Sequence, residues 1–137
     1  MAIELDIVTP NGVVFQGPVD DVVLPGVEGE FGVLTGHERF LTPVDIGELT
    51  IHSAEATVYA AISDGFAEVN GDRVTVLVDS CEVAAEIDVA RAERARARAE
   101  QNLAELERDE DERRYDEYEA ALRMAETRVA VSEHAGS

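Results

Sequence analysis

Hydrophobic residues follow two different periods along this chain, and the change from one to the other divides the sequence in two. Near the N-terminus, Ile3, Leu5 and Ile7 alternate with acidic residues, a period of two that buries one face of a β-strand. Beyond residue 88 the apolar residues recur at spacings of three and four, which is typical of amphipathic helices. The pattern therefore predicts a β-rich first half and a helical second half.

Glycine and proline follow the same division. All four prolines and nine of the ten glycines lie within residues 10–71, and residues 72–135 contain neither. Both residues mark turns and are unfavourable inside helices. Pro10-Asn11-Gly12 is expected to end the first strand, and Asn70-Gly71 is the strongest hairpin signal. Further strands are predicted at residues 13–16, 19–24, 32–34, 48–51, 57–62, 66–69 and 74–78. Short strands separated by so many turns indicate an antiparallel sandwich or barrel.

The second half is predicted to form two helices. Asp88 is a suitable N-cap for the first, because its carboxylate can accept bonds from unpaired backbone N–H groups. Asp109 and Glu112 have the spacing of an acidic capping box, so the second helix is expected to begin there. On each helix, the apolar residues at these spacings form a seam, that is, the stripe expected to be buried against a neighbour. The seam of the first helix is Ala92, Ala95, Ala99, Leu103 and Leu106, and that of the second is Tyr115, Tyr118, Leu122, Ala125 and Val129. Together the helices form an antiparallel hairpin about 30 Å long.

The seam of the first helix consists largely of alanine. Alanine has about three fewer carbons than leucine, so each such position contributes roughly 2 kcal/mol less burial. The helices are expected to be stable as helices, since Ala, Arg and Glu favour that state, but to be weakly held by their neighbours. This composition favours a movable element, and a permanently docked pair of helices is the alternative.

The net charge is −19, and none of the 11 basic residues is a lysine. So negative a field repels phosphate backbones, which argues against nucleic-acid binding. Residues 1–87 carry −14 and residues 88–137 carry −5. The apolar runs are too short to cross a bilayer and the first residues do not resemble a signal peptide, so a cytosolic or peripheral protein without direct membrane insertion is expected. Cys81, close to Asp79 and Glu82, is interpreted as an unreactive thiol.

Residues that could carry chemistry are sparse. His37, His52 and His134 share no metal-ligand spacing with Cys81, so no metal site is predicted. A β-sandwich hydrolase that uses scattered acids and His37 is the enzymatic alternative, and it has no supporting motif. Residues 24–42 contain four glycines and are expected to form an exposed, shaped loop with Glu30 at its tip, a candidate docking surface. An ordinary glycine-rich connection is the alternative, and His37 is interpreted as a turn or capping residue.

Arginines gather at the start of the first helix. Arg91, Arg94 and Arg98 lie at i, i+3 and i+7 and share one face. Cations are mildly unfavourable near a helix N-terminus, so this face needs an anionic counterpart. The counterpart is the protein's own acids, an acidic partner surface, or a phosphate ligand held by guanidinium groups. The simplest interpretation is a solvated face with pairs such as Glu93 with Arg96.

Two segments, in this order, resemble the ε subunit of F-type ATP synthases, which is the δ subunit in mitochondrial naming. LPGVEGEFGVLTGH at residues 24–37 is similar to its signature loop, with Thr35 where the family often has proline. SDGFAEVNGDRVTVLVDSCEVAAEIDVARAERARARAE at residues 63–100 is similar to its last strands and hinge. The resemblance implies an N-terminal antiparallel β-sandwich of about ten strands, residues 1–86. It also implies a C-terminal two-helix hairpin, residues 87–135.

The resemblance implies a function as a non-catalytic central-stalk subunit that helps couple proton-driven rotation to ATP synthesis. The sandwich of this family binds the γ subunit and the c-subunit ring, and the implied contact loop contains Glu30, Phe31 and His37. The hairpin folds onto the sandwich or extends along γ, where it meets the catalytic β and α subunits and inhibits ATP hydrolysis. The implied contacts to the β subunit are Arg91, Arg94, Arg98 and Arg123. The implied location is the cytoplasmic face of the bacterial plasma membrane, as a peripheral part of F1.

The resemblance implies no required cofactor but offers ATP as a candidate regulatory ligand. Ile87-Asp88-Val89-Ala90-Arg91-Ala92 matches the I/L-D-x-x-R-A motif of ATP-binding members in full. The implied site consists of Glu82, Ile87, Asp88, Arg91, Ala92, Arg98 and Arg128. In it, Arg91 and Arg98 hold phosphate while Ile87 and Ala92 pack on the base. Met124 stands where these members have a second arginine, which predicts weak binding. An ATP-sensing module without a stalk role is the alternative function.

Overall fold

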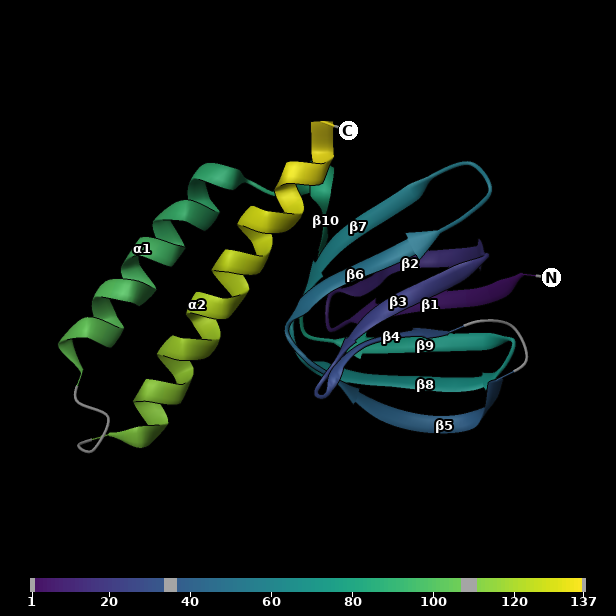
Figure 1. Cartoon of the computed structure of the whole chain (residues 1–137), viewed down its shortest axis with the longest axis horizontal. Coiled ribbons are helices and arrows are strands. Elements are labelled where there is room, and N and C mark those ends of the chain that lie inside the picture. The colour runs from purple at the N-terminus through teal and green to yellow at the C-terminus, as the bar shows by residue number, and fades with distance from the viewer. Residues whose placement is uncertain (1, 34–36, 107–110, 137) are drawn as a thin grey trace.

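The computed structural model describes residues 2–33, 37–106 and 111–136, which form a ten-stranded β-sandwich with two helices on one side (Figure 1). The strands are β1 (Ile3–Thr9), β2 (Gly12–Val19), β3 (Asp21–Gly26), β4 (Gly29–Val33), β5 (His37–Val44), β6 (Gly47–His52), β7 (Thr57–Ile62), β8 (Gly65–Gly71), β9 (Arg73–Val78) and β10 (Cys81–Val83). The helices are η1 (Ala84–Glu86), α1 (Val89–Glu105), α2 (Glu112–Ser132) and η2 (Glu133–Gly136), of which η1 and η2 are short 3₁₀ helices. The predicted sandwich followed by a helical hairpin is confirmed.

The strands form one continuous ladder that folds into two layers. Its order is β10-β7-β6-β3-β5-β8-β9-β1-β2, with β4 paired to β3. In the described part of the chain, β3 and β5 are joined by a single residue pair, Gly26 with Val44, which forms the narrow junction between the two layers. Described pairs are antiparallel except β1 with β9, which run parallel. A parallel pair needs a long connection, and here the whole chain between the two strands provides it.

The core lies between the layers and contains the residues that the alternating pattern marked. Ile3, Leu5 and Ile7 are each at most 1% exposed. Asp6, between Leu5 and Ile7 in sequence, lies on the opposite side of β1 and is nevertheless only 8% exposed. Its Oδ2 atom accepts a bond of 2.9 Å from Nη1 of Arg73. Burial of this carboxylate is therefore compensated by a charged partner.

The glycine-rich segment is not the loop that the sequence suggested. Residues 24–33 form the end of β3, a two-residue turn at Val27 and Glu28, and β4. Gly29 adopts a φ of 123°, which favours glycine. A Cβ on Gly26 would lie 2.7 Å from the carbonyl oxygen of Gly29, so only glycine fits this hairpin. Glu30 is exposed but lies within β4, opposite Pro25, and Val27 and Glu28 occupy the tip.

The helices begin at aspartates. The carboxylate of Asp88 accepts a bond of 3.1 Å from the backbone N–H of Arg91, as predicted. For α2 the prediction was wrong by two residues, because Asp111 is the N-cap and accepts from the backbone N–H of Arg114 at 3.0 Å. Asp109 lies outside the described residues. With Asp111 as the N-cap, Glu112 is the first residue of the helix, and its negative charge suits the positive end of the helix dipole.

The seam of α1 follows a slightly different stripe from the predicted one. Ala92 and Ala99 are buried, but Ala95 is exposed and Arg96 is half-buried in its place. α1 packs along α2, so only a narrow stripe is covered, and positions 92, 96 and 99 lie on it. The Arg96 side chain is 42% exposed, and its Nε atom lies 3.5 Å from Oε1 of Glu100.

α2 lies between α1 and the sandwich (Figure 1). Its predicted seam includes the buried Ala125, and its sandwich-facing side carries Met124 and Val131. The buried members of the cluster between sandwich and helices are Ala61, Ala84, Ile87, Met124 and Val131. This cluster is separate from the core of the sandwich and much smaller. The hairpin thus docks on the sandwich through a small apolar contact.

Candidate functional site

A groove opens where the sandwich and both helices meet the hinge, which is the segment of residues 84–88 that joins β10 to α1. It has a volume of about 680 Å³. The residues that line it come from β10, η1, α1 and α2 and from the link before α1: Glu82, Glu86, Asp88, Arg91, Ala92, Arg94, Ala95, Arg98 and Arg128. Segments on both sides of the hinge therefore contribute to one concave surface.

Four arginines make the groove cationic despite the acidic chain. Arg91, Arg94 and Arg98 extend from one face of α1 and are exposed. Arg128 reaches in from α2, and its Nε atom donates a bond of 2.7 Å to Oε1 of Glu82. Guanidinium groups bind carboxylates and phosphates through paired N–H donors. Because Glu82 already holds Arg128, the guanidinium groups of α1 are the groove's available cations.

The structure brings together six of the seven residues of the implied ATP site. Glu82, Asp88, Arg91, Ala92, Arg98 and Arg128 all line the groove. Ile87 does not, because it is 8% exposed and packs in the cluster between sandwich and α2. Glu86, Arg94 and Ala95 also line the groove and were not among the residues that the sequence implied for this site. The signal for Arg94 was present, because it shares the i, i+3 face with Arg91.

Arg123, which the resemblance implied as a contact to another subunit, is engaged within the chain. Its Nη2 atom lies 2.9 Å from Oδ2 of Asp45 and 3.4 Å from the carbonyl oxygen of Ile46. The hydrogen bond from Arg123 lowers the pKa of Asp45, and the bond to Asp45 raises the pKa of Arg123. This pair fastens α2 to the sandwich, and the two residues are 78 positions apart in sequence.

The residues implied as the contact loop fall into different environments. Glu30 is exposed on β4. Phe31 is half-buried and packs against the core of the sandwich. The backbone of His37 begins β5 opposite Gly71, and its side chain lies outside the described residues. Of the three, Glu30 is the side chain that the structure places at the surface.

A second surface with binding character lies on the outer face of the β5-β8-β9-β1-β2 layer. Cross-strand neighbours there form an apolar row, which consists of Pro43, Phe66, Leu77, Val8 and Val13. Phe66 is 52% exposed and Leu77 is 49% exposed. Contiguous exposed apolar side chains on a soluble domain mark an interaction surface.

The sequence model described as the beta-sandwich domain of the ATP synthase delta/epsilon chain matches residues 2–84. The model described as the long alpha-helix domain of the same chain matches residues 85–133. The chain belongs to the ATP synthase delta/epsilon chain family. The groove of this delta/epsilon chain lies at the join between the two matched parts.

Curated relatives of this delta/epsilon chain are bacterial ATP synthase epsilon chains. The one from Sulfurovum sp. is 50% identical over 52 residues, which is 38% of this chain and 41% of the relative. The one from Aliarcobacter butzleri is 46% identical over 54 residues, 39% of this chain and 43% of the relative. The chain thus spans about two fifths of the length of these relatives, with 41% and 43% in the two cases.

Solved structures extend the likeness to nearly the whole fold. A chain of the Euglena gracilis mitochondrial ATP synthase, in a structure of OSCP, F1 and c-ring, superposes with a TM-score of 0.80 at 27% identity. The match covers 94% of this chain and 80% of that one. A chain of the Tetrahymena thermophila central stalk and c-ring has a TM-score of 0.66 at 11% identity, covering 94% and 97% of the two chains, and it supports the fold alone.

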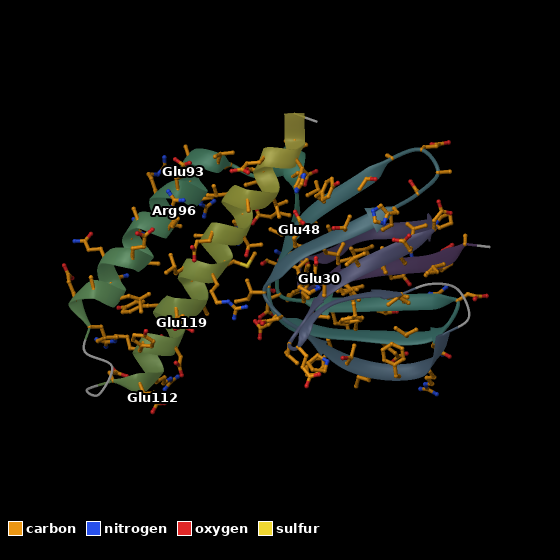
Figure 2. The ribbon with its side chains drawn as sticks, in the orientation of Figure 1. Glu30, Glu48, Glu93, Arg96, Glu112 and Glu119 are labelled. Atoms are coloured by element: carbon orange, nitrogen blue, oxygen red, sulfur yellow. The ribbon has the colours of Figure 1, made fainter. Side chains whose placement is uncertain are left out.

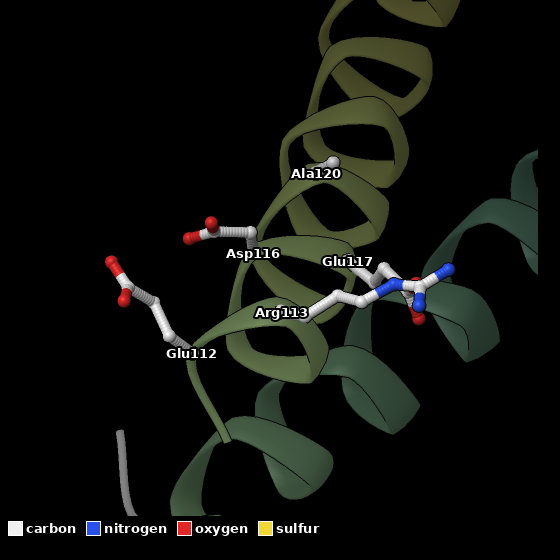
Figure 3. Close-up of a pocket in the computed structure, with 5 residues that line it drawn as sticks. All are labelled: Glu112, Arg113, Asp116, Glu117 and Ala120. Carbon is white, nitrogen blue, oxygen red and sulfur yellow. The ribbon is translucent and has the colours of Figure 1, made fainter. Parts of the chain in front are cut away.

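A further hollow in the described part of the chain offers less chemistry than the groove. It lies on the outer side of α2, where Glu112 and Asp116 point away from the helix and Arg113 lies beside Glu117 (Figure 3). The Nε atom of Arg113 is 3.5 Å from Glu117, so its charge is already paired. Within the described ranges, no cluster of three or more His, Cys, Asp or Glu could hold a metal ion. No helix there is long and apolar enough to span a membrane.

Proposed function

We propose that this chain is the non-catalytic central-stalk subunit of an F1Fo ATP synthase. In this role the sandwich binds the γ subunit and the c ring, so that rotation driven by protons is transmitted to the catalytic subunits. The helical hairpin leaves the sandwich and, with its arginine face on acidic β-subunit surface, inhibits ATP hydrolysis. The subunit works at the cytoplasmic face of the bacterial plasma membrane as a peripheral part of F1.

The outer apolar row carries the stalk role. It crosses the layer of the sandwich that includes Phe66 and Leu77, and it needs a partner because exposed apolar side chains gain free energy when they leave water. A hollow of about 520 Å³ is lined by three members of the row, Val8, Phe66 and Leu77, and also by Asp64 and Asp79. A partner with an apolar strip edged by cationic or hydrogen-bonding groups fits this surface, and γ is that partner.

The small cluster between the sandwich and the helices supports the mobility of the hairpin. Two of its five buried members are alanines, Ala61 and Ala84, and it is separate from the core. Loss of the cluster would therefore leave the sandwich intact. Arg91, Arg94 and Arg98 are exposed on α1. An acidic surface of the β subunit would meet them when the hairpin extends.

Co-purification with the cognate γ subunit tests the stalk role. The double variant Phe66→Ser and Leu77→Ser should lose γ, because it makes the row polar without touching the core. Val27→Ser is the matched control, since Val27 is 63% exposed at the tip of the β3–β4 turn and lies outside the row. Retention of γ by the double variant, or failure of the unmodified chain to bind γ, contradicts the proposed stalk role.

A second candidate function, ATP sensing, is favoured by the groove. Arg91 and Arg98 point from α1 into the same concave surface as Arg128, and a triphosphate would match these cations. The engagement of Arg128 by Glu82 at 2.7 Å predicts that binding is weak.

Calorimetric titration of the isolated chain with ATP, with and without Mg²⁺, tests this candidate. Arg91→Ala should weaken binding at least about tenfold, whereas Arg113→Ala should not, because the Arg113 side chain is 91% exposed and outside the groove. Equal weakening by both variants would indicate a nonspecific charge effect. Absence of saturable binding at millimolar ATP would refute the ATP-sensing candidate and would leave the proposed stalk role unaffected.

A further inference from the structure

The hairpin and the apolar row lie on different layers of the sandwich. α2 packs against β6, β7 and β10, and Glu48 of β6 lies at the edge of the sandwich that faces α2 (Figure 2). The apolar row crosses the outer face of the β5-β8-β9-β1-β2 layer, where Phe66 and Leu77 are half-exposed. The docked hairpin therefore leaves this face open to a partner.

A second cross-strand row runs beside the apolar row on the same face. It is displaced by two residues along β5, β8, β9 and β1 and is mostly polar; its members are Leu41, Glu68, Thr75, Asp6 and, on β2, Gln16. Side chains two residues apart on a strand share a face, so Arg73 of β9 lies on the same face as Thr75 and Leu77. The apolar row is thus bordered by a polar row, with Arg73 beyond it.

Asp6 and Arg73 form an ion pair on this face, and their exposure differs widely. The Nη1 atom of Arg73 lies 2.9 Å from Oδ2 of Asp6, and the two side chains are 62% and 12% exposed respectively. A carboxylate so far removed from water needs a charged partner, so Asp6 constrains the guanidinium group. A guanidinium has five N–H donors in a planar fork, and the bond to Asp6 occupies one edge of it. The exposed remainder of the fork is available to a partner.

Cations are rare in the sandwich. Residues 1–87 contain sixteen acids and two arginines, Arg39 and Arg73, which lie on β5 and β9 of the layer that carries the apolar row. The exposed Glu4 is the neighbour of Arg73 across the β1–β9 ladder, and the exposed Glu68 lies in the polar row. A carboxylate of a partner is therefore repelled over most of this face and attracted where it meets a guanidinium group.

We propose that Arg73, held by Asp6, is the anchor that fixes the position of the γ subunit along the apolar row by donating paired N–H bonds to a carboxylate of γ. This inference rests on the proposed function, in which γ covers the row. Apolar contacts supply affinity without direction, so they leave the position of γ along the row undetermined. A guanidinium–carboxylate contact fixes both distance and direction.

Asp6 is the positioning residue of this anchor. An unpaired arginine side chain loses conformational freedom when a partner immobilises it, and this loss weakens binding. The bond from Arg73 to Asp6 imposes part of that restriction before γ arrives. The exposed Glu4 and Glu68 disfavour a γ carboxylate that lies beside Arg73 instead of against it, so the acids sharpen the selection of one position.

The affinity of the full chain for immobilised cognate γ, measured by biolayer interferometry, tests the anchor. The double variant Asp6→Asn with Arg73→Gln replaces the ion pair by two amides, so the net charge stays at −19 and no buried carboxylate loses its partner. Its Kd for γ should rise about tenfold, mainly through faster dissociation, at an unchanged melting temperature. A purely structural role of the pair would not produce this combination.

The matched control is Arg113→Gln with Glu117→Gln. It neutralises an exposed ion pair on α2, also at constant net charge, and should leave the Kd unchanged. Arg73→Lys is the second variant, and it decides the matter if the double variant does not fold. It keeps a cation beside Asp6 but removes the planar fork, so the Kd should rise about threefold.

An unchanged Kd in the folded double variant or in Arg73→Lys would overturn the anchor, and so would equal weakening by the double variant and the control. In each of these cases the unmodified chain still binds γ, and the stalk role is unaffected. Failure of the unmodified chain to bind γ would overturn the stalk role and the anchor together. The two failures are therefore distinguishable.

Discussion

Replacement of Val131 by alanine is expected to release the hairpin while the sandwich stays folded. Val131 is fully buried in the cluster between sandwich and helices, and with Met124 it is one of the two buried side chains that α2 contributes there in the described part of the chain. The change removes two carbons, worth about 1.6 kcal/mol of burial, and the cavity left behind adds to this. Docking should therefore weaken by about 2 kcal/mol, or roughly 30-fold.

Methyl NMR offers a direct assay, because the chain has two methionines, Met1 and Met124. The Met124 signal reports whether the interface is closed, since its side chain packs in the same cluster as Val131. Val131→Ala should shift this signal towards the position of an exposed methionine, or broaden it by exchange. The melting temperature of the sandwich should change little.

Val76→Ala is the matched control, because Val76 is also fully buried but belongs to the core of the sandwich. It should lower the melting temperature of the sandwich and leave the Met124 signal in its docked position. If Val131→Ala and Val76→Ala gave the same pattern, the sandwich and hairpin would unfold as one unit. The separation of the two apolar clusters would then have no energetic meaning, and the argument for a movable hairpin would fail.

Three further perturbations test individual features. Asp45→Asn should weaken docking of the hairpin by about 0.5–1 kcal/mol at pH 7, because it removes the ion pair with Arg123. Since Arg123 lowers the pKa of Asp45, the difference in docking free energy between variant and unmodified chain should shrink as acid protonates Asp45. A difference that grows in acid would contradict the pairing. Gly65→Ala should prevent or severely weaken folding, measured by thermal melting, because its Cβ would lie 2.0 Å from the carbonyl oxygen of Leu77, whereas Gly32→Ala, with open space around it, should melt normally. Cys81 should react with iodoacetamide about 100-fold more slowly at pH 7.5 than an exposed thiol, since burial and the nearby Glu82 raise its pKa to about 11; labelling at the exposed rate would refute this.

Local patterns predicted most elements because they depend on residues close in sequence. The alternation from Ile3 to Ile7 gave the first strand, and the Asn70-Gly71 hairpin joins β8 and β9. The cap at Asp88 needs only the next turn of chain. The arginine face of α1 follows from helical periodicity, so the groove's cations could be named before their surroundings were known.

Where the sequence misled, long-range pairing was responsible. Residues 24–33 were interpreted as part of a loop because glycine signals a turn, but eight of these ten residues pair in the β3–β4 hairpin, which glycine makes tight enough to close. β5 was missed because its strand character comes from pairing with β8. Ala95 is exposed and Arg96 half-buried, the reverse of the prediction, because α1 packs mainly on α2 among the described elements and the angle between the two helices decides which stripe is buried.

The sequence by itself determined the division into a sandwich and a helical hairpin, the start of α1 and the basic face beside the hinge, since periodicity, turn residues and caps act within a few positions. Only the tertiary structure decided that β1 runs parallel to β9, that Arg123 is held by Asp45 78 positions away, and that Arg128 is held by Glu82 46 positions away. The contact of His134 with Tyr59 and Glu48 belongs to the same group. Each of these contacts joins two segments that are far apart in sequence and that only the packed core brings together. Neither segment alone contains a pattern from which the contact could be predicted.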